Sequence, residues 1–170
     1  MPSIDSLRPP ALLMRAAEAE TLSGDPGGVI TLLADASATD GALNAHRSTF
    51  RDGHDGAPPH YHERCSELFF ILDGSLQVLL GDEVAVLDRG DVLVVPPGVP
   101  HAFAAAPGAD ADVLFVFSPG IERFEYYRLL DRVHRGDGSW QEVADTQERF
   151  DNHYTDSPAW TAARTTQGPA

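Results

Sequence analysis

The sequence contains no lysine, and all 12 of its basic side chains are arginine. Chemistry that depends on a lysine amine, such as Schiff-base formation or phosphate binding by a P-loop lysine, is therefore excluded. The 26 acidic side chains outnumber the basic ones and give a formal net charge of −14. Because so acidic a chain repels phosphate backbones and anionic lipids, we expect no nucleic-acid partner and no membrane role.

Cysteine and long apolar runs are also scarce. Cys65 is the single cysteine, so no disulfide can form within the chain. No stretch approaches the roughly 18 apolar residues of a membrane span. Met1–Arg15 lacks a basic leader followed by a long apolar segment, so we expect no secretory signal. These absences predict a cytoplasmic location, and a composition rich in Ala, Arg, Asp and Gly is typical of a bacterial protein.

The length of 170 residues suits one domain, and its 15 glycines and 13 prolines punctuate short apolar runs. We interpret the runs as strands, and turn pairs such as Asp73-Gly74 predict an antiparallel sheet that closes on itself. A Gly/Pro-rich loop is predicted over residues 52–59. The predicted strands are Ala11–Arg15, Val29–Leu33, Leu43–Phe50, Leu68–Leu72, Ser75–Leu80, Glu83–Leu87, Asp91–Val95, His101–Ala105 and Val113–Phe117.

From Ser118 the pattern becomes helical. A Ser cap, a proline in the first turn and apolar residues at 121, 124, 127, 130 and 133 predict a helix. A second short helix is predicted around Trp140–Phe150. We therefore expect a single domain over 1–170, with a barrel at about 11–118, a helical extension at about 119–152 and a loose tail at about 153–170.

Two clusters carry residues suited to chemistry. His60 and His62 are two residues apart, so on a strand both side chains leave from one face. Glu67 is an odd number of residues from His62, so on a continuous strand it would point to the opposite face. A turn or bulge within residues 63–66 would bring it back to the face of the histidines. His101 opens a later strand, from which a third imidazole would come. Three imidazoles and a carboxylate suit one divalent metal ion, and they do not distinguish Fe, Mn, Co, Ni, Cu and Zn.

These clusters resemble the two sequence motifs of the cupin superfamily. The first motif is HxH, four residues, Glu, six residues, Gly, and it matches at His60, His62, Glu67 and Gly74. The second is Gly, five residues, PxG, two residues, His, and it matches at Gly90, Pro96, Gly98 and His101. The family usually has Asn four residues after the last His, where this chain has Ala105. That departure concerns the surroundings of the metal rather than its ligands.

The resemblance implies an all-β fold, a jelly-roll-like antiparallel β-barrel, with a C-terminal helical extension. It also implies that His60, His62, Glu67 and His101 surround one metal ion. The layout is similar to small single-domain, quercetin-dioxygenase-like cupins, which implies an enzyme that uses O2 on a small hydroxylated aromatic or enol substrate. Glu67 would then be the catalytic base. Cupins are often dimers, so we also expect a homodimer.

Several alternatives stay open at this stage. The phenylalanines that share strand faces with the clusters are expected to line an apolar substrate pocket, or else simply to fill the barrel: Phe69, Phe103, Phe115 and Phe117. The same scaffold would also suit a cyclase or isomerase of a polyketide or sugar-like substrate, with the metal acting only as a Lewis acid. A third reading is non-catalytic binding of a small molecule or metal. Cys65 is expected to be a small buried thiol rather than a ligand.

Overall fold

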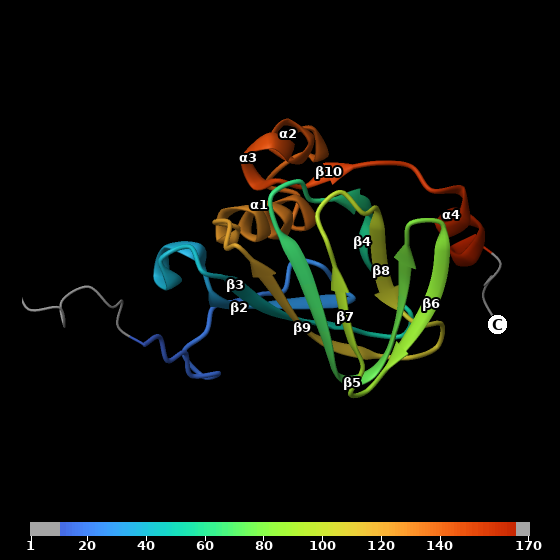
Figure 1. Ribbon diagram of the computed structural model, residues 1–170, viewed down its shortest axis with the longest axis horizontal. Coiled ribbons are helices and arrows are strands. Elements are labelled where there is room, and N and C mark those ends of the chain that lie inside the picture. The colour runs from blue at the N-terminus through green and yellow to red at the C-terminus, as the bar shows by residue number, and fades with distance from the viewer. Residues whose placement is uncertain (1–10, 166–170) are drawn as a thin grey trace, which may run out of the picture.

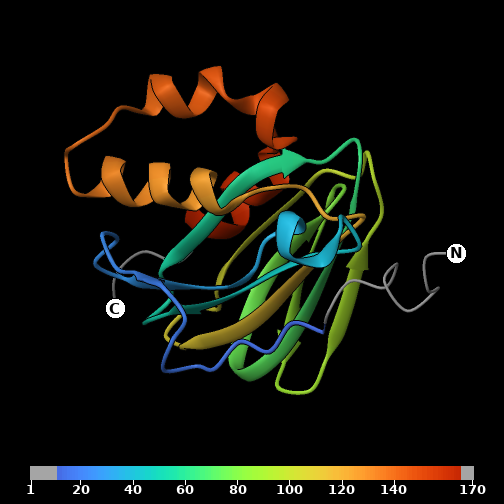
Figure 2. The same cartoon turned by 90° about the vertical axis from the view of Figure 1, so that its left-hand side faces the viewer.

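The computed structural model describes residues 11–165, in which a ten-stranded antiparallel sheet curls into a half-barrel. The helices within residues 124–150 lie over one end of it, and the last helix lies at its side (Figures 1 and 2). The strands are Thr21–Leu22 (β1), Gly28–Ala34 (β2), Asn44–Phe50 (β3), Asp55–Tyr61 (β4), Ser66–Leu80 (β5), Glu83–Asp88 (β6), Val92–Val95 (β7), His101–Ala105 (β8), Ala111–Ser118 (β9) and His153–Tyr154 (β10). The helices are Ala36–Thr39 (a 3-10 turn, η2), Phe124–His134 (α1), Trp140–Asp145 (α2), Gln147–Phe150 (α3) and Pro158–Thr165 (α4).

The long strand β5 connects the two parts of the half-barrel. Its first half pairs with β7 and β9, and its second half pairs with β6 and β8. The predicted turn at Asp73-Gly74 is therefore wrong, because the chain bends there without reversing. Gly74 has a φ of 72°, and a Cβ on it would lie 2.0 Å from the Asp110 carbonyl oxygen. The sequence signal for a turn thus marks a bulge where β5 passes from one group of strands to the other.

The predicted loop over 52–59 is the second difference, because β4 begins at Asp55. This strand pairs irregularly with β8, with register shifts on both sides of Ala57. Pro58 and Pro59 fall between the paired positions Ala57 and His60, where the ladder needs no N–H from them. Gly and Pro therefore mark an irregular strand here rather than a loop.

The N-terminal prediction also fails, because Ala11–Arg15 forms no strand and the sheet begins at β1. The remaining predicted strands are present, with ends shifted by a few residues. Helix α1 starts later than the predicted Ser118, which is the last residue of β9. Its first turn is capped from a distance, because the carboxylate of Asp35 accepts hydrogen bonds from the backbone N–H groups of Arg123 and Phe124.

The predicted loose tail at 153–170 is a further correction. Residues 153–154 form β10 beside β4, and α4 follows. Trp160 of α4 is buried against Leu79, Ala102 and Ala104. A Trp among small polar residues was the signal that this segment packs onto the barrel. Residues 166–170 of the predicted tail lie outside the described part of the chain.

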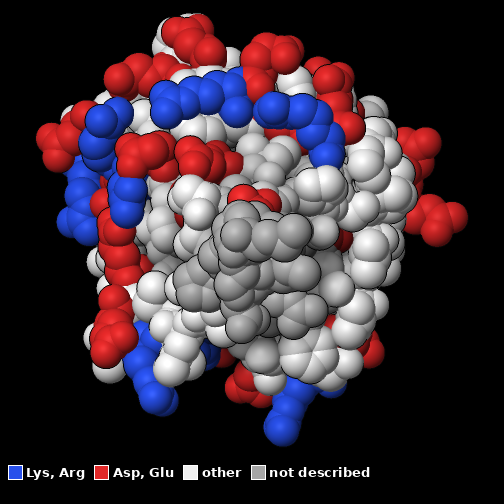
Figure 3. All heavy atoms as spheres, turned by 60° about the vertical axis from the view of Figure 1, so that its left-hand side comes forward, with Lys and Arg blue, Asp and Glu red and all other residues white. Residues whose placement is uncertain are grey.

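Two apolar clusters hold the molecule together. One fills the barrel with aromatic and aliphatic side chains from β3, β5, β8 and β9. The other joins Leu32 of β2 to Tyr127, Val143 and Phe150 of the helices. Arginine and acidic side chains intermingle on the surface over the helices, at the top of the view in Figure 3. None of the helices in residues 11–165 has the length and hydrophobicity of a membrane span.

Candidate metal centre

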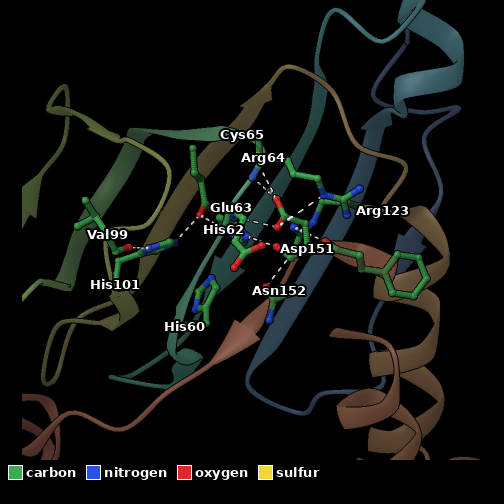
Figure 4. Close-up of polar contacts among 12 residues, drawn as sticks. His60, His62, Glu63, Arg64, Cys65, Val99, His101, Arg123, Asp151 and Asn152 are labelled. Atoms are coloured by element: carbon green, nitrogen blue, oxygen red, sulfur yellow. Dashed lines mark hydrogen bonds and ion pairs between the residues drawn. The ribbon is translucent and has the colours of Figure 1, made fainter. Parts of the chain in front are cut away.

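The structure brings the four predicted ligands together at one point. Their ligand atoms all lie within 4.8 Å of one another, and each of the four residues is at most 2% exposed. Figure 4 shows the imidazoles of His60, His62 and His101 converging from different segments. Glu67 supplies the carboxylate from the start of β5.

Strand pairing explains why these segments meet. His60 on β4 lies directly opposite His101 on β8, as expected for a third imidazole from a neighbouring strand. The turn between β4 and β5 lies between His62 and Glu67, and it lets the Glu67 carboxylate point to the same side as the histidines. The N–H of Gly98 also donates to the carbonyl oxygen of His62, at 2.7 Å, which ties the second sequence motif to the first.

Each imidazole is oriented through its Nδ1. This atom donates to a backbone carbonyl oxygen in every case: His60 to Pro58 (2.8 Å), His101 to Val99 (2.9 Å) and His62 to Asp151 (2.5 Å). Because the proton is held on Nδ1, the lone pair of a neutral imidazole lies on Nε2. Metal-binding histidines are commonly fixed in this way.

The Nε2 atoms of two imidazoles approach the same carboxylate oxygen. Oε2 of Glu67 lies 2.7 Å from His101 Nε2 and 3.0 Å from His62 Nε2. Burial tends to raise the pKa of Glu67, but the hydrogen bonds to His101 and His62 outweigh it and hold that pKa well below its usual range. Burial lowers the pKa of His101, whereas its contact with Glu67 raises it more, and the net shift is upward.

This arrangement fits a divalent cation. With neutral imidazoles, two Nε2 lone pairs would face the Glu67 oxygen, and either added protons or a cation among them removes the repulsion. Burial, followed by repulsion from His101 and His62, lowers the pKa of His60 well below its usual value, so this imidazole stays neutral and able to ligate. Four such ligands leave one or two positions of a five- or six-coordinate ion free, as at catalytic sites.

A cavity of about 390 Å³ reaches His60 and Glu67 and runs beneath α1 and α2. Of the four phenylalanines assigned to a pocket, Phe103 and Phe117 line it. Phe69 and Phe115 do not: they are fully buried behind it, with ring centroids 4.9 Å apart. The alternation of residues along a strand predicts which side chains point into the barrel. It does not predict which of these side chains line the cavity and which are packed behind its wall.

His46 is a cavity residue to which sequence reasoning gave no role. Burial lowers its pKa to about 3, so the imidazole is neutral. Its Nδ1 lies 3.0 Å from Tyr127 Oη, and its ring stacks on Phe115 with 4.7 Å between centroids. The alternating buried positions 44, 46, 48 and 50 of β3 were the signal that points it inward.

Comparison with known proteins agrees with this geometry. Residues 46–117, which include all four clustered ligands, match the family described as the cupin domain. Residues 46–117 of this barrel are therefore similar to a cupin domain. The match supports the predicted superfamily, and the quercetin-dioxygenase-like subtype is not distinguished by it.

Solved structures of cupin proteins share the fold. KdgF from Halomonas sp. is 26% identical, with a TM-score of 0.56, and the alignment covers 65% of this chain and 94% of that one. An RmlC-like cupin from Shewanella frigidimarina is 21% identical, with a TM-score of 0.56 and coverage of 69% and 96%. The polyketide cyclase RemF from Streptomyces resistomycificus is 17% identical, with a TM-score of 0.54 and coverage of 73% and 97%.

Curated relatives match over shorter shares of their length. An uncharacterized protein of Streptomyces coelicolor, SCO3923, is 37% identical over 65 residues, which is 38% of this chain and 58% of that one. The potassium channel KCNH2 of Sus scrofa is 33% identical over 126 residues, or 71% of this chain. The matched part spans only 10% of the length of that channel.

Proposed function

We propose that this cupin is a metal-dependent dioxygenase that acts on a small hydroxylated aromatic or enol substrate. The observation that supports it is the buried cluster of three histidines and Glu67, which opens on a cavity with an apolar wall. Such a site holds one divalent ion and leaves room beside it for a planar molecule and O2. The same geometry does not favour one metal over another.

The residues of the site would have separate roles in this reaction. A divalent ion held by the four side chains would lower the pKa of a substrate hydroxyl placed beside it. Glu67 would accept the proton of that hydroxyl, and the resulting electron-rich anion is the form that reacts with O2. Phe103 and Phe117 would hold the ring and exclude water. His46 and Tyr127 would offer neutral hydrogen-bonding groups in the same cavity.

The direct test is O2 consumption. The protein would be stripped with a chelator, reloaded separately with Fe(II), Mn, Co, Ni, Cu or Zn, and supplied with flavonols and simpler enols. We expect uptake with at least one metal, and its loss in Glu67→Ala. An absence of uptake with every metal and substrate would contradict the proposal.

A cyclase or isomerase is the second candidate. The polyketide cyclase RemF shares the fold, and a divalent ion held by the cluster would serve equally well as a Lewis acid in a reaction without O2. Turnover under strictly anaerobic conditions would favour this function over the oxygenase. Ligand binding without turnover, under either atmosphere, would instead indicate a binding protein.

A further inference from the structure

Arg123 is a buried cation without an acidic partner. The residue is 2% exposed. Its Nη1 donates to the Phe150 carbonyl oxygen at 3.2 Å, and its Nη2 donates to Asn152 Oδ1 at 3.0 Å. Its Nε has no hydrogen-bond acceptor. Among the buried side-chain N and O atoms of residues 11–165, it alone lacks a hydrogen-bond partner. Within the same residues, no carboxylate oxygen lies within 4.0 Å of its guanidinium nitrogens.

The side chain belongs to the cavity that contains Glu67. Arg123 lines it, and the guanidinium carbon lies 4.5 Å from the ring centroid of Phe117 and 5.1 Å from that of Tyr126, which line it too. The other acidic residues of the lining already have basic partners: Asp25 with His54 (2.7 Å), Asp55 with Arg164 (2.9 Å) and Asp131 with Arg135 (2.8 Å). The positive charge of Arg123 is thus left for a molecule that enters the cavity.

The charge balance of the cavity points the same way. Burying an ionised group is costly unless a counter-charge accompanies it. With a divalent ion bound, the ion and Arg123 carry three positive charges, and Glu67 supplies one negative charge. His46 is neutral. Apart from the carboxylates that already have basic partners, the cavity lining would then carry a net positive charge in a protein whose formal charge is −14, and an anionic ligand complements it.

We propose that Arg123 is the specificity residue for an anionic substrate, and that it binds a carboxylate attached to an aromatic body. This inference deepens the proposed function, on which it rests for the metal in the same cavity. The planar guanidinium suits a carboxylate oxygen, and Nε–H is the donor that the protein leaves unused. Phe103 and Phe117 provide the apolar surface for the ring.

The test compares two probes of equal size, 2-naphthoate and 2-naphthamide. Binding of each to the zinc-loaded full chain would be measured by calorimetry. We expect naphthoate to bind at least about tenfold more tightly, the range of a charge-assisted hydrogen bond. Arg123→Gln should bring the ratio close to one, and Arg123→Lys should keep part of it. Arg128→Gln is the matched control, because Arg128 lies on α1 five residues after Arg123, is half-exposed, and pairs with Glu20.

A readout without substitution covers the case in which the Arg123 variants do not fold. The Nε–H resonance of Arg123 in the wild-type protein should shift on addition of naphthoate and stay in place with naphthamide. Equal affinity for the two probes, no binding of naphthoate, or a carboxylate preference that survives in Arg123→Gln would each overturn the proposal. Repeating the titration after chelator treatment separates the two ideas, since the carboxylate preference must persist without metal even if no oxygenase activity is ever found.

Discussion

The backbone carbonyl oxygen of Asp151 accepts a hydrogen bond from Nδ1 of His62, 89 residues away in the sequence. The carboxylate of Asp151 accepts two more, from the backbone N–H groups of Glu63 and Arg64 in the turn after His62. Asp151 is itself fully buried at the end of α3. The helical extension thus fixes the orientation of one predicted metal ligand.

Replacing Asp151 should therefore weaken metal binding. Asp151→Ala leaves two N–H groups without their acceptor, which costs about 2 kcal/mol or more of unfolding free energy, and it loosens His62. We expect zinc affinity, measured by competition with a chromophoric chelator, to fall about 10- to 100-fold. Asp151→Asn should lose less, because Asn keeps one acceptor and tolerates the φ of 51°. Exposed Asp145→Asn is the control, and wild-type affinity in Asp151→Ala would contradict this role.

Removing one imidazole of the cluster should abolish stable metal binding. His101→Gln takes away a ligand from β8 and leaves Glu67 with one histidine partner. We expect elemental analysis to give about one ion per chain for the wild type and less than about a tenth of that for the variant. His54→Gln, outside the cluster, should match the wild type. Full metal content in His101→Gln would place the ion elsewhere.

Metal binding should strengthen as the pH rises. Contact with Glu67 raises the pKa of His101 in the metal-free protein, so the stabilisation from this proton is present at low pH and is lost as pH rises through that pKa. Metal binding must displace the proton, so protons compete with the ion below this pKa. We expect the shift in Tm produced by zinc to grow between pH 6 and pH 8 and then level off. A shift that does not vary over this interval would count against a protonated His101.

Gly74 should tolerate no side chain. A Cβ would meet the Asp110 carbonyl oxygen at 2.0 Å, so the bend of β5 would have to move. Gly81→Ala is the matched variant, because Gly81 also has a positive φ, of 61°, but its Cβ would meet nothing within 4 Å. We expect Gly81→Ala to cost about 1 kcal/mol in urea unfolding and Gly74→Ala at least about 2 kcal/mol more. Equal costs would show that the close approach is unimportant.

The thiol of Cys65 should be inert while the protein is folded. Burial is the main cause that raises its pKa to about 12, so almost no thiolate exists at pH 8. We expect a disulfide reagent to modify the native protein on the order of 100-fold more slowly than the urea-unfolded chain. Fast modification of the native state would show that the site opens. The sequence-based interpretation of a small buried thiol agrees with its 1% exposure.

The positions of most strands along the chain and the four clustered residues could be predicted because their signals are local. His60 and His62 share a spacing, and a Pro/Gly turn places His101 at the start of a strand. The signals that failed were Gly and Pro in β4 and at Gly74. These residues interrupt the backbone pattern both in loops and in irregular strands, and only the pairing with β8 or β9 decides which is formed.

The roles of Arg123 and Asp151 could not be predicted because they arise from packing between distant segments. Arg123 stands between a glutamate and a phenylalanine at the start of a helix, where an arginine is usually solvated. It is buried because the helical extension folds over the end of the barrel. Asp151 orients His62 through its backbone carbonyl, which carries no sequence signal, and its carboxylate holds the turn after His62.

We predict above all that His60, His62, Glu67 and His101 hold one divalent ion. A crystal structure of metal-loaded protein, with anomalous data collected on either side of the metal absorption edge, tests it directly. We predict a single strong anomalous peak about 2.0–2.2 Å from the three Nε2 atoms and a carboxylate oxygen of Glu67. A fully loaded crystal with no peak there, or with its peak at another group of side chains, would contradict the claim.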